Sequence, residues 1–239
     1  MKINLDEGYQ FGLGAFETIR VDGGVPKLLK RHIQRLNHTL EYLDISNRIT
    51  EGQVQRWLEE KGLKQGALKV MASRENTVIT SRANPYGPRQ WELGFQMDYS
   101  PIRRNETSPL VYHKTFHYGD CLLEKRRAAK EGMDERIFLN GRGELCEGTC
   151  TNLFFASGDQ VYTPKLSCGL LPGVVRSVLL ELGLARETVL RKEDVKNMDE
   201  CFVTNSLMEI MPVRRLGDVM FSGRAQAEKC LTVFRSCQV

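Results

Sequence analysis

The sequence has no apolar run long enough to span a membrane, and its first residues, MKINLDEGYQ, lack the apolar stretch of a secretory signal. It also lacks a basic run interleaved with aromatic residues, the pattern typical of nucleic-acid binding. The net charge of +4 comes from 34 basic and 30 acidic residues, an excess that favours small anionic ligands only mildly. We therefore expect a cytoplasmic protein that binds neither a membrane nor a nucleic acid.

The seven cysteines have no disulfide-framework spacing, as expected of reduced thiols. Two of them, Cys146 and Cys150, stand four residues apart in GELCEGTCTNLFF, which is not the close CxxC spacing of a metal-binding pair. The four histidines all lie well upstream. This pair is either half of a zinc site or two buried free thiols, and the spacing favours the thiols. We expect no bound metal.

The 239 residues suffice for one large domain or two modest ones. FETIRVDGGVPKLL predicts a hairpin around a Gly-Gly turn. Helical spacing of apolar residues in KRHIQRLNHTLEYL and TEGQVQRWLEEKGL predicts two amphipathic helices, the second opened by Thr50 as N-cap.

A polar stretch near the middle of the chain predicts a domain boundary. We place a small N-terminal domain at 1–104, a linker at 105–112 and a larger domain at 113–239. The second half mixes a helix, GDCLLEKRRAAKEG, with strands such as ERIFLN and CTNLFFAS. The pattern is that of an α+β protein with mixed sheets, not of a regular βαβ succession.

Lys114, in VYHKTFHYGD, follows an apolar strand and precedes a helix. The ordinary interpretation of such a lysine is a solvated charge at a strand edge. The alternative is a desolvated lysine with a lowered pKa, able to form a Schiff base and move protons. Tyr118, four residues on, would then hydrogen-bond an oxygen of the bound carbonyl compound.

LLPGVVRS places Pro172 and Gly173 immediately before a helix. The first amides of that helix, from Val174 and Val175, together with the helix dipole would form a seat for an anion. The alternative is a routine turn into a helix. Arg35 is likewise either a surface charge or a planar partner for a phosphate.

Glu147 is the last candidate. It would ordinarily be exposed at a strand entrance, but if buried it could hydrogen-bond the protonated ring nitrogen of pyridoxal phosphate. The polar residues of VTNS, which are Thr204, Asn205 and Ser206, either cap a turn or donate to the same anion as the helix amides. No single feature is specific, and the order of the features along the chain carries the argument.

That order resembles the class IV pyridoxal-phosphate aminotransferases, which include branched-chain and D-amino-acid transaminases and 4-amino-4-deoxychorismate lyase. The resemblance covers nearly the whole chain, through GYQFGLGAFETIR, HIQRL, HKTFHYGDCLLEKRRAAKEGMDE, GELCEGTCTNLF, VYTPKLSCGLLPGVVR and DECFVTNSLMEIMPV. It implies a two-domain fold of type IV, similar to D-amino-acid aminotransferase. A small N-terminal α/β domain would precede a larger mixed β pseudo-barrel that binds pyridoxal 5'-phosphate, and the protein would be a homodimer.

Residue by residue, the resemblance makes Lys114 the Schiff-base lysine and proton shuttle, and Glu147 the carboxylate on the pyridine nitrogen. It implies that the cofactor is also bound by Arg35, Tyr118, Val174, Val175, Asn205 and Ser206. It implies substrate contacts from Phe11, Phe16 and Lys69. The glutamate, and not the cysteines around it, is therefore the expected functional residue of GELCEGTCTNLFF.

Two motifs look more like aminodeoxychorismate lyases than like branched-chain transaminases. These are FETIR and TNSLMEIMPV, where branched-chain enzymes have FEGIR and GTAAEITPV. Lys69 stands where those enzymes carry an arginine for the substrate carboxylate, and lyases commonly carry lysine there. The RxH element of D-amino-acid transaminases is not recognisable, and the segment after Arg74 is short.

We expect a lyase that converts 4-amino-4-deoxychorismate to 4-aminobenzoate and pyruvate, a step of folate biosynthesis. Two alternatives stay open. One is a class IV aminotransferase acting on branched-chain or D-amino acids with a 2-oxo acid acceptor. The other is a pyridoxal-phosphate-binding protein without turnover, although retention of both Lys114 and Glu147 argues against a mere binder.

Overall fold

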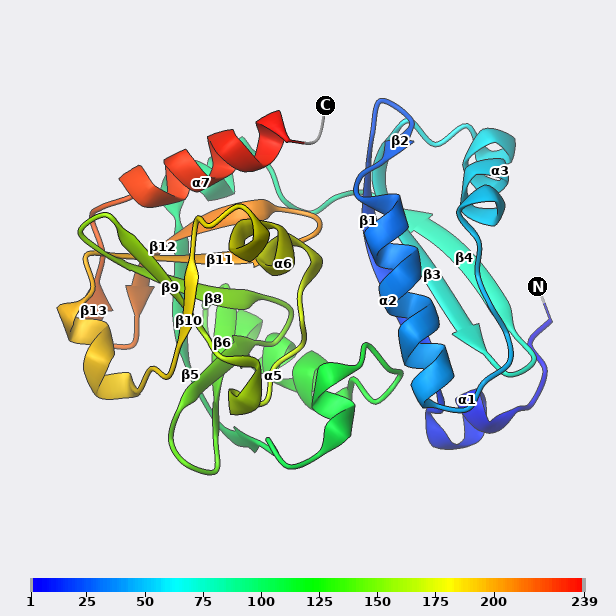
Figure 1. The fold of residues 1–239 in the computed structure, drawn as a ribbon, viewed down its shortest axis with the longest axis horizontal. Coiled ribbons are helices and arrows are strands. Elements are labelled where there is room, and N and C mark those ends of the chain that lie inside the picture. The colour runs from blue at the N-terminus through cyan, green and yellow to red at the C-terminus, as the bar shows by residue number, and fades with distance from the viewer. Residues whose placement is uncertain (1, 238–239) are drawn as a thin grey trace. The chain divides into compact units, whose positions relative to one another are not determined.

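The computed structural model describes residues 2–237, which form two compact units (Figure 1). The first unit contains the chain up to Pro85 together with residues 113–118, and the second contains residues 86–112 and the chain from Gly119 onward. The division predicted from the sequence, with its linker at 105–112, does not coincide with this one. The two divisions differ because strand pairing between distant parts of the chain determines which unit a segment joins, and local sequence patterns do not reveal such pairing.

Two segments account for that difference. Strand β5 (Phe95–Arg104), expected in the small domain, pairs in parallel with two strands of the second unit. Residues 113–118, expected in the large domain, lie along the start of the first strand of the first unit: Phe16 N donates to Lys114 O and Phe116 N donates to Gly14 O, both at 2.9 Å.

The first unit is built on an antiparallel sheet in the order β2-β1-β3-β4. Its strands are β1 (Gly14–Asp22), β2 (Val25–Pro26), β3 (Gln65–Ser73) and β4 (Thr77–Arg82). The predicted Gly-Gly hairpin joins β1 to β2, and its two glycines have φ of 61° and 84°, values in the left-handed region that favours glycine. The helices are α1 (Glu7–Phe11), α2 (Leu29–Tyr42) and α3 (Glu51–Lys61).

Both predicted amphipathic helices are confirmed, as α2 and α3. Ile33, Leu36 and Leu40 of α2 recur at helical spacing and are buried against one face of the sheet. Thr50 caps α3: its hydroxyl accepts from Gln53 N, while the Gln53 side chain accepts from Thr50 N. One face of the sheet is thus covered by helices, and the side chains of alternate strand residues point to the other face.

The second unit is a mixed β-barrel. Its main sheet runs in the order β10-β9-β8-β11-β12-β5-β6-β7, and an additional pairing of β7 with β8 closes a ring of strands. Apolar side chains such as Met97, Ile137, Leu153 and Val203 fill the closed ring. Besides β5, the strands are β6 (Glu135–Asn140), β7 (Leu145–Gly148), β8 (Asn152–Ser157), β9 (Gln160–Pro164), β10 (Arg186–Thr188), β11 (Glu200–Asn205), β12 (Glu209–Leu216) and β13 (Val219–Met220).

Short helices surround this barrel. They are α4 (Pro88–Leu93), α5 (Gly119–Lys130), α6 (Val174–Glu181) and α7 (Ala225–Ser236), with the 3-10 turns η1 (Pro109–Tyr112), η2 (Leu166–Cys168) and η3 (Lys192–Asn197). The α+β class predicted from the sequence is therefore confirmed. None of the helices within residues 2–237 is both long enough and apolar enough to cross a membrane.

Candidate functional site

Lys114 lies on the face of the first sheet that the helices leave open. Its Nζ is 4.5 Å from the centroid of the Phe16 ring and 5.2 Å from that of the Tyr118 ring. The two rings meet edge to face, with their centroids 5.2 Å apart. A cation held against aromatic faces is attracted by their electron-rich surface, so this arrangement fixes the position of the ammonium.

Lys69 approaches the same aromatic ring. Its Nζ is 4.7 Å from the centroid of Phe16, and partial burial together with the positive charge of Arg82 lowers the pKa of Lys69. The structure therefore brings together four of the residues predicted from the sequence. These are Phe16, Lys69, Lys114 and Tyr118.

Arg35 projects from α2 onto a fully buried carboxylate of β1, Glu17. Its Nε and Nη2 donate to the two oxygens of Glu17 at 2.7 and 2.8 Å, and His32 Nδ1 lies 2.7 Å from the same carboxylate. Burial opposes ionisation of Glu17, but Arg35 and His32 outweigh it and lower the pKa of Glu17 to about 2. Burial also lowers the pKa of His32, despite the neighbouring carboxylate. Glu17 thus fixes the direction of the Arg35 guanidinium.

Phe11 is a predicted residue of the first unit whose side chain is largely exposed. It is the last residue of α1, and 64% of its surface is exposed. The predicted substrate contact of Phe11 stays a prediction.

In the second unit, Glu147 lies near the end of β7 and is buried. One of its oxygens accepts from Leu171 N at 3.1 Å, and the other forms an ion pair with Arg104 at the end of β5. Arg104 in turn lies over the Phe138 ring. The sequence analysis missed Arg104, because the pair Arg103–Arg104 at a strand end does not reveal which guanidinium turns inward.

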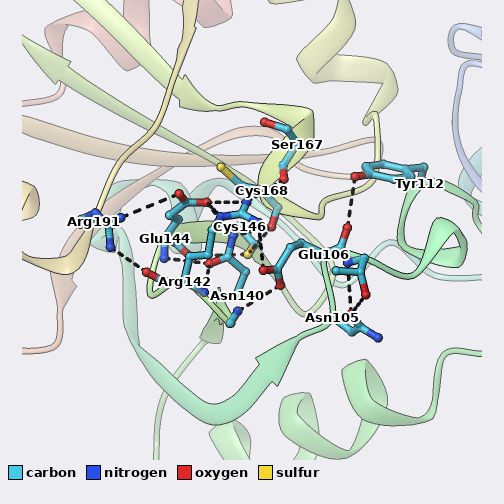
Figure 2. A network of polar contacts seen from close by, with 12 residues as sticks. Asn105, Glu106, Tyr112, Asn140, Arg142, Glu144, Cys146, Ser167, Cys168 and Arg191 are labelled. Atoms are coloured by element: carbon cyan, nitrogen blue, oxygen red, sulfur yellow. Dashed lines mark hydrogen bonds and ion pairs between the residues drawn. The ribbon is translucent and has the colours of Figure 1, made fainter.

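Cys146, the residue before Glu147, belongs to a network of polar contacts (Figure 2). Its thiol donates to Cys168 O at 3.0 Å, and the Asn140 side chain donates to the same carbonyl. Burial raises the pKa of both cysteines, so the thiols are neutral. Their contacts anchor the turn η2, which leads toward Leu171, and Glu147 receives the amide of Leu171.

The cysteines of GELCEGTCTNLFF are embedded in the second unit. Within residues 2–237 no three His, Cys, Asp or Glu side chains come together as metal ligands. Cys150 contacts the buried carboxylate of Glu135 at 3.3 Å, and burial raises the pKa of its thiol to about 12. The thiols therefore pack and donate hydrogen bonds.

The N-terminus of α6 follows Gly173, which offers no side-chain cap. The first helical hydrogen bond runs from Ser177 N to Gly173 O, so the amides of Val174 and Val175 precede the bonded turn. An added Cβ at Gly173 would lie 1.8 Å from Asn152 Oδ1, which shows how closely this turn approaches β8. Only glycine permits that approach.

Thr204, a polar candidate of VTNS, lies beside that turn. It is paired across the strands with Asn152, so the two side chains share one side of the sheet. The Thr204 hydroxyl is buried, and within the described residues it has no hydrogen-bond partner. Its neighbour Asn205 is occupied differently, because its side-chain oxygen accepts from the amides of Leu207 and Met208.

The predicted residues thus fall into two sets, one in each unit. Phe11, Phe16, Arg35, Lys69, Lys114 and Tyr118 belong to the first unit, and Glu147, Val174, Val175, Asn205 and Ser206 belong to the second. The buried arginine Arg104 was missed because its surroundings are set by strand pairing.

Residues 14–216 match the model of the amino-transferase class IV family. This chain belongs to the class IV aminotransferases. The match spans both units and includes every predicted site residue except Phe11.

Two curated class IV relatives are similar along most of their length. The aminodeoxychorismate lyase of Bacillus subtilis is 28% identical over 243 residues, covering 92% of this chain and 83% of the relative. The D-alanine aminotransferase of Bacillus licheniformis is 25% identical over 242 residues, covering 91% and 84%. One relative is thus named as a lyase and the other as an aminotransferase.

The fold has a close match among solved structures. The 4-amino-4-deoxychorismate lyase from Pseudomonas aeruginosa superposes with a TM-score of 0.86, covering 99% of this chain and 95% of that chain at 23% identity. This likeness shows the fold alone. The chain has the type IV fold of the class IV enzymes, with a small antiparallel sheet domain and a mixed β-barrel domain.

The lowered pKa of the Glu17 carboxylate makes the stability of the protein depend on pH. Because folding lowers its pKa from 4.5 to about 2, the stabilisation from its charge is complete above about pH 4.5 and is lost as the pH falls to about 2. We expect Glu17→Gln to lower the unfolding free energy by about 3 kcal/mol at neutral pH, because it leaves Arg35 without its partner.

Urea unfolding followed by circular dichroism from pH 7 to pH 2 measures this difference. The gap between wild type and Glu17→Gln should close as the pH falls. Glu59→Gln on the exposed side of α3 is the control and should change the unfolding free energy little. A gap that stays constant across the pH range would contradict the role assigned to the Glu17 charge.

Proposed function

We propose that this class IV enzyme is a lyase that converts 4-amino-4-deoxychorismate to 4-aminobenzoate and pyruvate, with pyridoxal 5'-phosphate as cofactor. The observation that carries the proposal is the pair of lysines at Phe16. Lys114 and Lys69 approach one aromatic ring at 4.5 and 4.7 Å, so a second ammonium stands beside the expected reactive one. A carboxylate-bearing amine suits this pair, since Lys69 can hold the carboxylate while Lys114 acts on the amine.

The donor groups of the chain fit pyridoxal phosphate. A phosphate would accept hydrogen bonds from the uncapped amides of Val174 and Val175. It could also accept one from the Thr204 hydroxyl, which has no partner among the described residues. The permanently charged fork of Arg35 suits the same group. We retain Asn205 and Ser206, at the end of β11, as further phosphate contacts.

The cofactor contributes the chemistry that side chains lack. When bound, pyridoxal phosphate supplies an aldehyde that takes up amino groups and a ring that withdraws electrons from the adjacent bonds. Lys114 would hold the aldehyde carbon at rest. Once displaced by the substrate amine, Lys114 would remove the ring proton of the substrate and then protonate the departing enolpyruvyl group.

Two side chains would tune this reaction. Glu147 would accept a hydrogen bond from the protonated ring nitrogen, and its ion pair with Arg104 and its bond from Leu171 N would keep it oriented. Tyr118, whose ring lies against Lys114, would hydrogen-bond the ring oxygen of the cofactor. Phe16 would support both the lysine and the substrate ring, and Phe11 would contact the substrate.

A transaminase and a cofactor-binding protein are the competing functions. The similarity to a D-alanine aminotransferase supports the first, since a transaminase uses the same lysine and carboxylate and needs a 2-oxo acid acceptor; a branched-chain substrate belongs to the same alternative. The second would need no buried Glu147–Arg104 pair, because a mere binder requires no protonated ring. We therefore favour an enzyme.

The deciding experiment supplies the loaded enzyme with 4-amino-4-deoxychorismate, made in situ from chorismate and glutamine by the synthase. We expect rapid formation of 4-aminobenzoate, followed by its fluorescence. A parallel sample with D- and L-amino acids and 2-oxoglutarate should show little transamination. Fast transamination without 4-aminobenzoate would replace the lyase by a transaminase.

The same assay includes Lys114→Ala, with Lys61→Ala on the exposed side of α3 as the control. Lys114→Ala should lose all turnover and the yellow colour of lysine-bound cofactor, and Lys61→Ala should keep both. Full turnover by Lys114→Ala would contradict both enzyme functions.

Glu147→Gln tests the role of the buried carboxylate. A neutral amide cannot keep the ring nitrogen protonated, so kcat should fall by about 100-fold or more while the cofactor still binds. Absorbance titration with pyridoxal phosphate and steady-state kinetics measure the two properties separately. Glu193→Gln, in the exposed turn η3, should change neither. An unchanged kcat for Glu147→Gln would remove this residue from the mechanism.

The protein is also proposed to be a cytoplasmic homodimer. Large apolar side chains stand in solvent in each unit: Tyr9 of the first is 75% exposed, and Leu123 of the second is 50% exposed. Side chains of this size are candidates for contact with a second chain where they form a contiguous patch. Sedimentation velocity should give twice the 27.3 kDa of the chain, and a species of 27.3 kDa at micromolar concentration would contradict a stable dimer.

A further inference from the structure

The open face of the first sheet carries side chains in ordered rows, set by the strand register. Arg20, Ala67 and Arg82 are directly opposite one another on β1, β3 and β4. The next row holds Thr18, Lys69 and Thr80, and the row beyond it holds Phe16, Met71 and Val78. Directly paired residues share a face, so the rows run from apolar at Phe16 to cationic at the two arginines.

The spacing of the rows fits an elongated ligand. At about 3.3 Å per residue, the row of Arg82 lies roughly 13 Å along the strands from that of Phe16, with Lys69 halfway between them. Lys114 stands over the ring of Phe16 at the apolar end. Arginine and lysine side chains are long enough to bridge diagonal positions on a sheet, so Arg82 and Lys69 can meet one anionic group.

The charges of these two residues are not neutralised within the described residues. Lys69 contacts the ring of Phe16 and has no carboxylate partner there. The guanidinium of Arg82 donates to Ala83 O at 3.4 Å and likewise has no carboxylate in the described part of the chain. Arg20, by contrast, forms an ion pair with Asp22 at 3.3 Å. Two neighbouring cations repel one another, and an anion bound to both would relieve that repulsion.

Partial burial lowers the pKa of Lys69, and the positive charge of Arg82 lowers it further, which places the two cations within electrostatic reach. Arginine offers a planar fork that can hold both oxygens of a carboxylate, and lysine adds a point charge. A purely apolar substrate side chain would face the ammonium of Lys69 and the guanidinium of Arg82 in this position. The face therefore suits a ligand with an anionic group at a distance from its amine.

We propose that Arg82 is a specificity-determining residue, which together with Lys69 binds a substrate carboxylate remote from the reacting amino group. The proposal rests on the proposed function, in which Lys114 acts on the amine. It narrows the substrate class to amines with a distant carboxylate, such as a ring amine with a carboxylate across the ring, and disfavours branched-chain amino acids.

Succinate and succinamide form a matched pair of probes, because they share one four-carbon skeleton and neutral amides replace the carboxylates in succinamide. Calorimetric titration of the cofactor-loaded protein measures their dissociation constants. Arg82→Ala should weaken succinate binding by about tenfold or more, the effect of one hydrogen-bonded charge pair, and change succinamide binding by less than about twofold. Arg56→Ala, an exposed arginine on α3, removes the same charge from the helix-covered side and should change neither.

Arg82→Gln keeps most of the side-chain length and removes the charge, so it should lose the same succinate affinity as Arg82→Ala. Equal weakening of both probes, or full succinate affinity in either variant, would overturn the proposal. The titration needs no turnover, so it is independent of the lyase assay. A failed lyase assay with an intact succinate preference would remove the proposed reaction and leave the carboxylate site.

Discussion

The buried carboxylate of Glu17 constrains the first unit more than any other group. A charge without solvent must be paired, and this one is held by Arg35 and His32, both on α2. The pairing fixes the position of α2 against β1 at Glu17. It also fixes the register of β1, since a shift by one residue would move Glu17 to the open face and bring Phe16 into the core. The aromatic support for Lys114 therefore depends on a charge pair on the opposite side of the same strand.

The second unit solves an equivalent problem around Glu147. Its carboxylate is buried beside Arg104, and the amide of Leu171 supplies a further donor. That amide is available because the network of Figure 2 anchors η2 through Asn140, Cys146 and Cys168. The cysteines that attract attention in the sequence thus have an indirect part. They hold in place the loop that orients the glutamate.

Elements with a local signal could be predicted from the sequence. The spacing of Leu36 and Leu40 and the capping box at Thr50 specify α2 and α3 almost alone. The candidate residues Lys114 and Glu147 came from a resemblance in motif order, which carries information that no local pattern holds. Arg104 and Arg82 were not found, because a guanidinium becomes significant only through its neighbours on other strands. The placement of residues 113–118 failed for the same reason, since it depends on two backbone hydrogen bonds to β1.

Lyases and transaminases of this family begin from the same requirement, a lysine that exchanges places with a substrate amine. The residues that hold the cofactor therefore cannot separate the two reactions. What distinguishes the substrates is the part that does not react, and under our proposal that part would contact Lys69 and Arg82 on the first sheet. Contacts with a remote carboxylate can orient the reacting end of the substrate. Such orientation raises the reaction rate more than it raises the affinity. A short change at the edge of this sheet would then be enough to alter the substrate while Glu17, Lys114 and the fold stay as they are.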